Sequence, residues 1–346
     1  MKHPPLAPDW LDQPHRRLDL GDFHLESGEI IREAHISYVL HGNTSNLTDR
    51  AILVTTSIGG THHRLDFLIG HDNALDTDKF CVIAVDALGN GLSSSPSTSR
   101  LQPTTLFPRF SIRDMVASQG RLLDALGVKK LVAVVGASMG GMQAVQWGVS
   151  YPDRMAGIAA ITPMAKTSLW SQLVNEMSRT ALFADVACSV PRPRADGLRL
   201  WTPLTELIMA RTPQGLGAFA THAELIEWLE IRCQSFFEDG PDPFDWCYQT
   251  WAYDAHDVGV TPGFGGDTEA ALQQIRAAVI AFAPSCDLYN PPEEARRMCQ
   301  VIRGAEFVEL PGHDGHKSAG GLSKEPTAVL RSRIRAFLSS LSSVSS

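Results

Sequence analysis

Residues 131–142 have the sequence Leu-Val-Ala-Val-Val-Gly-Ala-Ser-Met-Gly-Gly-Met, in which a short apolar run leads directly into Gly-x-Ser-x-Gly. The run predicts a buried parallel strand, and residues 142–151 predict the helix that follows it. A serine on so tight a turn projects its hydroxyl clear of the sheet, and Gly136 and Gly140 leave room for the turn. This stretch therefore predicts a nucleophilic serine, Ser138.

Strand and helix patterns alternate along the chain on both sides of this motif. Strands that alternate with helices form a mostly parallel sheet with helices on both faces, so we predict an α/β fold. We expect a β-hairpin region within residues 1–50, strands at 51–56, 80–85, 156–161, 278–283 and 306–310, and helices at 111–126 and about 326–341.

The alternation stops between residues 164 and 268. This segment contains no convincing strand pattern, but it has several helical stretches rich in Trp, Leu and Met. Such an insertion is typical of a helical lid over a sheet. We predict four parts: the first part of the α/β core at 1–163, the lid at 164–268, the second part of the core at 269–338, and a flexible Ser-rich tail at 339–346.

The composition is that of an ordinary globular enzyme, with 346 residues, 44% of them hydrophobic and 20% charged. The net charge of −8 and the lack of a basic stripe argue against a nucleic-acid partner. No apolar run predicts a signal peptide or a membrane span. The six cysteines are scattered without a CxxC pair, which argues against disulfides and a zinc site and favours a reducing, cytoplasmic location. We expect neither cofactor nor metal.

Two later strands are each followed by residues that suit a base and an acid. A serine hydroxyl needs a base to become nucleophilic, and the base needs an acid that orients it. In α/β sheets these groups come after the serine in the order Asp, His. Asp287 follows the strand at 278–283, and both His313 and His316 follow the strand at 306–310.

The Gly-rich loop after residues 51–56 is the expected source of an oxyanion-binding N–H group. We nominate the N–H of Ile58, together with the N–H of Met139 immediately after the serine. His62 and His63 follow this loop. They either line the acyl pocket or are ordinary polar loop residues, and the sequence leaves both interpretations open.

Taken together, these residues resemble the homoserine O-acetyltransferase family of the α/β-hydrolase fold. The resemblance implies Ser138 as nucleophile, Asp287 as acid, Ile58 and Met139 as oxyanion donors, a helical lid and commonly a dimer packed through lid helices. The family's catalytic histidine stands six positions after the strand end and is preceded by glycine, which favours His316. His313 is also preceded by glycine and is followed by aspartate, so it remains the alternative base. The matching stretches are residues 25–28, 76–80, 107–116, 138–144 with 151–153, and 287–292.

The chain also departs from the transferases of this family. Residues 89–96 read Gly-Asn-Gly-Leu-Ser-Ser-Ser-Pro, which is similar to hydrolase-like relatives. Thr202 stands where the family has an arginine for the amino-acid carboxylate, and Lys317 stands where it has an aspartate for the ammonium group. A cation at that place repels an ammonium by roughly 1–4 kcal/mol at contact distance.

The sequence therefore favours a serine-dependent acyl hydrolase that acts on a small ester or amide. The alternative is an acyl-CoA-dependent O-acyltransferase, which forms the same acyl-enzyme but passes the acyl group to an alcohol in place of water. A catalytically silent binding protein is disfavoured, because a complete set of nucleophile, base, acid and oxyanion candidates is present.

Overall fold

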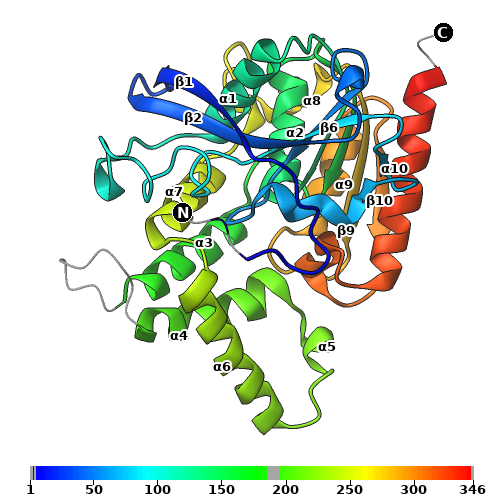
Figure 1. Ribbon diagram of the computed structural model, residues 1–346. Coiled ribbons are helices and arrows are strands. Elements are labelled where there is room, and N and C mark those ends of the chain that lie inside the picture. The colour runs from blue at the N-terminus through cyan, green and yellow to red at the C-terminus, as the bar shows by residue number, and fades with distance from the viewer. Residues whose placement is uncertain (1–2, 4, 185–194, 344–346) are drawn as a thin grey trace.

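An eight-stranded sheet forms the centre of the computed structural model, which describes residues 3, 5–184 and 195–343 (Figure 1). One edge of the sheet is antiparallel, because Ile30–His41 pairs antiparallel with both Arg16–His24 and Cys81–Val85. All other neighbouring strands pair parallel, so the predicted α/β fold is confirmed. In their order across the sheet, the strands are β1 (Arg16–His24), β2 (Ile30–His41), β6 (Cys81–Val85), β3 (Ala51–Thr55), β7 (Leu131–Ala137), β8 (Met155–Ile161), β9 (Ala278–Pro284) and β10 (Glu306–Leu310).

Helices cover both faces of this sheet. Those of one face pack on a core cluster that includes Leu53, Val134 and Ile158, and α10 packs with Leu330 and Ile334 on the opposite face. A separate two-stranded pair, β4 (Ile69–Gly70) and β5 (Leu75–Asp76), lies between β3 and β6 in the chain. The covering helices are α1 (Ile112–Ala125), α2 (Met139–Ser150), α8 (Thr268–Gln273), α9 (Pro292–Val301) and α10 (Lys324–Ser343).

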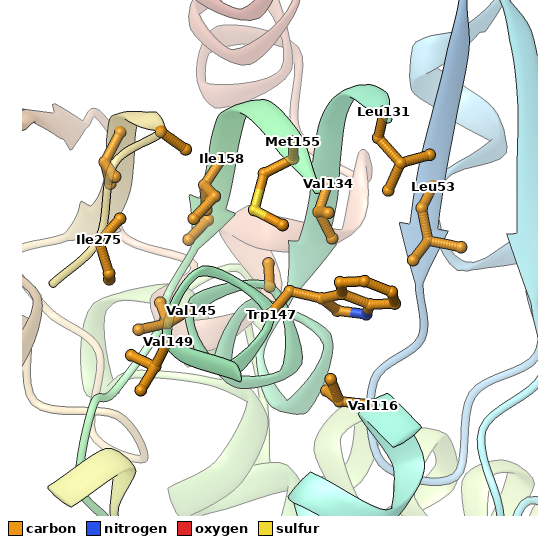
Figure 2. Close-up of a cluster of buried hydrophobic side chains, with 14 of the residues drawn as sticks. Leu53, Val116, Leu131, Val134, Val145, Trp147, Val149, Met155, Ile158 and Ile275 are labelled. Carbon is orange, nitrogen blue, oxygen red and sulfur yellow. The ribbon is translucent and has the colours of Figure 1, made fainter. Parts of the chain in front are cut away.

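Helix α2 is the most deeply embedded of these helices, because the sheet lies on one side and α1 on another. Figure 2 shows Trp147 and Val145 of α2 against side chains of β3, β7 and β8. Trp147 is fully buried, and its indole N–H donates to Gln119 Oε1 of α1 at 2.7 Å. Each such apolar side chain contributes roughly 1.5–3 kcal/mol by burial, so α2 is held firmly at the end of β7.

Helices also predominate in the described parts of the segment between residues 164 and 268, and they lie together beyond one end of the sheet (Figure 1). Among the described residues of this segment, the only β pairing is an isolated bridge between Lys166 and Asp257. The elements are α3 (Leu169–Leu182), α4 (Ala195–Leu204), a π-helix (Thr205–Ala210), α5 (Pro213–Leu216), α6 (His222–Asp239) and α7 (Pro243–Asp254).

The C-terminal helix is longer than the sequence predicts. A flexible tail was expected from residue 339, yet α10 continues to Ser343. Leu338 is buried and Leu341 packs against the same core cluster, so the apolar face of the helix extends into the Ser-rich stretch. Residues 344–346 lie outside the described part of the chain. None of the helices in the described ranges has the length and hydropathy to cross a membrane.

The turn between β7 and α2 has no room for side chains at its two glycines. A Cβ on Gly136 would lie 2.2 Å from the carbonyl oxygen of Gly140 and 2.3 Å from Thr55 Oγ1. A Cβ on Gly140 would lie 2.4 Å from the carbonyl oxygen of Thr55. Thr55 is fixed in β3 and Gly140 in the buried helix α2, so these neighbours cannot move aside. The packing supports the steric role that the sequence assigns to both glycines.

We expect Gly136→Ala to destabilise the fold by about 3 kcal/mol or more, or to prevent folding, because the added methyl group overpacks the turn. Gly304→Ala is the matched control: Gly304 has a φ of +73° but no atom within 4 Å of an added Cβ, so the cost is about 1–2 kcal/mol of backbone strain. Urea unfolding of both variants measures the difference. Equal midpoints would contradict the steric requirement.

Candidate active site

Ser138 lies at the apex of the turn with φ 58° and ψ −123°, a backbone conformation that residues other than glycine rarely adopt. The strain is held by the surroundings. The Ser138 N–H donates to the carbonyl oxygen of Ile161 in β8 at 2.8 Å, and the Ser138 carbonyl accepts from the Met142 N–H at 3.0 Å. Both bonds fix the backbone, so the hydroxyl is presented at the carboxyl end of β7.

A continuous chain of hydrogen bonds joins Ser138 to two residues from later in the sequence. Ser138 Oγ lies 2.8 Å from His316 Nε2, and His316 Nδ1 lies 2.7 Å from Asp287 Oδ2. Because the Asp287 carboxylate only accepts, Nδ1 carries the proton and Nε2 is left to accept from the serine hydroxyl. Asp287 follows β9 and His316 follows β10, as the chain order Ser, Asp, His requires.

The Asp287 carboxylate is held in place by the loop that contains it. Its Oδ1 accepts the backbone N–H groups of Tyr289 at 2.8 Å and Asn290 at 2.9 Å, while Oδ2 faces His316. The Asp287 side chain is fully buried, and the edge of the Tyr289 ring packs against the imidazole of His316. The acid can therefore orient the imidazole without competition from water.

The structure brings His316, and not His313, to the serine. The His313 side chain is exposed. Its backbone carbonyl oxygen accepts a hydrogen bond from the hydroxyl of Thr212. The six-residue spacing from the end of β10 thus places the second histidine of the loop in the hydrogen-bond chain.

The loop after β3 is fastened to both the turn and the helices of residues 164–268. Ser57 Oγ donates to the carbonyl oxygen of Ala137 at 2.8 Å, and the Gly59 N–H donates to Gln249 Oε1 of α7 at 2.7 Å. Ile58 lies between these two anchors and lines the same cavity as Ser138. Met139 is the first residue of α2, where the N–H groups of a helix lack partners within the helix.

A cavity of about 240 Å³ opens onto Ser138 and His316. Its walls are largely apolar on the side of the helical segment, and charged groups stand among the aromatic ones. A cavity of this size holds a small substrate rather than a long acyl chain. Its other lining residues are Ser57, Ile58, Gly59, Arg64, Trp201, Thr205, Glu206, Met209, Ala210, Arg232, Phe236, Pro241, Trp246, Tyr289 and Lys317.

Glu206 is the centre of a charged cluster in this wall that the sequence did not indicate. Its buried carboxylate is bound by Lys317 at 2.7 Å, by Arg232 at 3.0 Å and by Arg211 at 3.2 Å. Burial favours the neutral acid, but the hydrogen bond and charge of Lys317 and the charge of Arg232 outweigh it, so the pKa of Glu206 is lowered. Of the residues in this cluster, the sequence analysis named only Lys317.

Three further residues from the sequence analysis lie elsewhere. Thr202 is fully buried and is not among the residues that line the cavity. His62 and His63 are also absent from that lining; His63 instead lines a neighbouring pocket of about 780 Å³. Arg64, which the sequence analysis did not select, lines both pockets, and burial lowers the pKa of its guanidinium to about 10.

Known proteins are similar to this chain over most of its length. A model of the α/β-hydrolase fold matches residues 51–186. A homoserine O-acetyltransferase from Symbiobacterium thermophilum is 31% identical, with 92% of each chain covered. The chain belongs to the homoserine O-acetyltransferase-like family of α/β-hydrolase-fold enzymes.

This family includes esterases as well as transferases. An ethyl acetate hydrolase from Pseudomonas veronii is 30% identical over 94% of this chain and 96% of its own. The crystal structure of the acetyl esterase MekB superposes with a TM-score of 0.86 at 28% identity, covering 94% of this chain and 97% of that one. Membership of the family establishes that the chain is an enzyme of this fold, either an esterase or a related O-acyltransferase.

We expect His316→Ala to lower ester hydrolysis by several orders of magnitude, because the serine loses its base. His313→Ala is the matched control from the same loop, and it should retain nearly full activity because its side chain is exposed. Rates with a short p-nitrophenyl ester measure both. Loss of turnover in His313→Ala alone would contradict the hydrogen-bond chain as the active site.

Proposed function

We propose that this enzyme is a serine-dependent acyl hydrolase that cleaves a small ester or amide through an acyl-enzyme on Ser138. The observation that carries the proposal is the hydrogen-bond chain from Asp287 through His316 to Ser138. A serine hydroxyl bonded to an imidazole that is in turn oriented by a buried carboxylate is the arrangement that acyl transfer to serine requires.

In the first half of the proposed reaction, His316 Nε2 takes the proton of Ser138 as Oγ attacks the carbonyl carbon. The N–H groups of Ile58 and Met139 donate to the oxygen that gains negative charge. His316 then returns the proton to the leaving alcohol or amine, while Asp287 stabilises the imidazolium. In the second half, His316 takes a proton from water, the hydroxide attacks the acyl-enzyme, and the acid leaves as Ser138 regains its proton.

The size of the cavity and the names of the relatives both support a short acyl group. About 240 Å³ beside Ser138, walled by Trp201, Trp246 and Phe236, encloses a small apolar substituent. Two of the similar proteins are named as an ethyl acetate hydrolase and an acetyl esterase. We infer that an acetyl ester, or one of similar length, is the preferred substrate.

The charges around the cavity favour water over homoserine as acceptor. Arg64, Arg232 and Lys317 line the cavity, against the single carboxylate of Glu206. Glu206 is already bound by cations, so it has little capacity left for a substrate ammonium group. The ammonium of homoserine would meet an excess of positive charge, at a cost of roughly 1–4 kcal/mol per close contact.

The second candidate function is acyl-CoA-dependent O-acyltransfer. It is supported by the homoserine O-acetyltransferase among the relatives and shares the whole first half of the reaction. Its acceptor would be an alcohol without an ammonium group, because the cationic walls disfavour one.

We propose three features of the enzyme's setting. The helical segment at 164–268 acts as a lid between the two parts of the α/β core, as the sequence predicts. A homodimer forms through the lid, which is supported by a stripe of exposed apolar side chains at helical spacing on α3. The location is cytoplasmic, which is supported by the free thiols of all five described cysteines. The stripe consists of Leu169, Trp170, Leu173 and Met177.

We expect the acyl-enzyme to pass its acyl group to water even when homoserine is present. The enzyme is incubated with p-nitrophenyl acetate in the presence of homoserine, and separately with acetyl-CoA and homoserine, and the products are quantified by mass spectrometry. Acetate should dominate in the ester reaction, and Ser138→Ala should produce none above background. Homoserine-dependent release of CoA with O-acetylhomoserine as product, alongside negligible ester hydrolysis, would replace the proposal by its alternative.

A further inference from the structure

Four imidazole rings gather where the N-terminal segment crosses the start of the 3-10 helix His62–Leu68, outside the cavity that contains Ser138. The ring centroids of His62 and His63 are 4.1 Å apart, and the ring of His3 lies 5.5 Å from His62 and 5.1 Å from His63. His15 packs edge-on against His62 at 4.5 Å. One ring nitrogen of each of His3, His62 and His63 lies within 4.8 Å of the other two.

The two buried rings of this cluster are each held by a carboxylate on one nitrogen. His62 Nδ1 lies 3.1 Å from Asp86 Oδ2, and His63 Nδ1 lies 2.6 Å from Asp66 Oδ2. A carboxylate on Nδ1 fixes the ring and leaves Nε2 as the coordinating atom, which is the usual support of a metal-binding histidine. The sequence did not indicate this cluster, because His3 and Asp86 are distant in the chain from the His62-His63 pair.

One nitrogen in the cluster lacks any hydrogen-bond partner. His62 is fully buried, and its Nε2 is among the orphaned buried polar atoms of the described residues. Burying an imidazole nitrogen without a partner is unfavourable. His63 Nε2 lies 3.2 Å from His3 Nε2. Two nitrogens bound to one tetrahedral zinc ion lie about 3.3 Å apart, so this separation suits a shared metal ion.

The charges of the cluster are also unbalanced without a cation. Asp86 and Asp66 are buried, and the ion pairs recorded for them within the described residues are those with His62 and His63. A divalent cation bound to the ring nitrogens would supply the two positive charges that these two carboxylates lack.

We propose that His3, His62 and His63 bind a divalent transition-metal ion of the Zn²⁺ class. Three neutral imidazoles are a ligand set that zinc favours, and two positive charges balance Asp86 and Asp66. The ion would complete contacts already present between the N-terminal segment and this loop: Trp10 stacks on His63 with centroids 4.4 Å apart. The site is structural and fastens this segment close to the loop that contains Ile58.

The test is titration of the untagged, chelator-treated enzyme with Zn²⁺, followed by calorimetry and by thermal unfolding. We expect one Zn²⁺ per chain and an unfolding temperature that rises with Zn²⁺ concentration. His3→Gln removes a partly exposed ligand without touching the buried carboxylates, and it should weaken binding about tenfold or more. His24→Gln, on the exposed strand β1, is the matched control and should bind Zn²⁺ as the wild type does.

A second group of possible metal ligands serves as the competing site in this test. His71, Asp76 and Asp78 also lie within ligand distance of one another, but His71 and Asp78 are exposed. If His71→Gln abolishes Zn²⁺ binding while His3→Gln leaves it unchanged, the ion binds there and the proposal is wrong. It is equally overturned if the wild type shows neither stoichiometric binding nor a rise in unfolding temperature. Ester hydrolysis by Ser138 is measured separately, so its failure would concern the proposed function alone.

Discussion

The close approach of backbone to backbone at the end of β7 is the constraint on which the rest of the site depends. Gly136 and Gly140 let the turn close against Thr55 of the neighbouring strand, and this holds Ser138 at a strained, positive φ. Helix α2 tolerates the strain because it is buried between the sheet and α1, with Trp147 bonded to Gln119. Packing far from the Ser138 hydroxyl thus offsets the cost of the strained backbone at Ser138.

From that fixed point, the parallel sheet determines where the base and acid must stand. β7, β8, β9 and β10 are consecutive neighbours, so the loops after β9 and β10 reach the serine at the same edge. The cavity is then closed by helices from the segment at 164–268, which bring aromatic side chains and the Glu206 cluster. The sheet thus positions Ser138, Asp287 and His316, and this helical segment brings the charged Glu206 cluster to the cavity beside them.

The sequence was sufficient for the sheet and for the three residues of the hydrogen-bond chain that we propose to react, because both leave local signals. Apolar runs mark β3, β7 and β9, and Gly-x-Ser-x-Gly marks the turn at Ser138. The sequence did not indicate Glu206 or Arg232, because helices pack in an order that no local pattern encodes. The expectation of a flexible tail from residue 339 was wrong as far as Ser343 for a related reason: the serines of α10 obscure the apolar face formed by Leu338 and Leu341. The contact between His3 and His62 joins distant parts of the chain, so no local pattern indicates it.

Mapping the acyl group during turnover tests the central claim most directly. The enzyme is mixed with a short acetyl ester, quenched in acid within the first turnovers, digested and analysed by peptide mass spectrometry. We expect the acetyl group on Ser138, in an amount that decays at the rate of acetate formation once the ester is consumed. Acetylation of another residue in place of Ser138, or a Ser138 adduct that decays far more slowly than acetate forms, would contradict the proposed reaction.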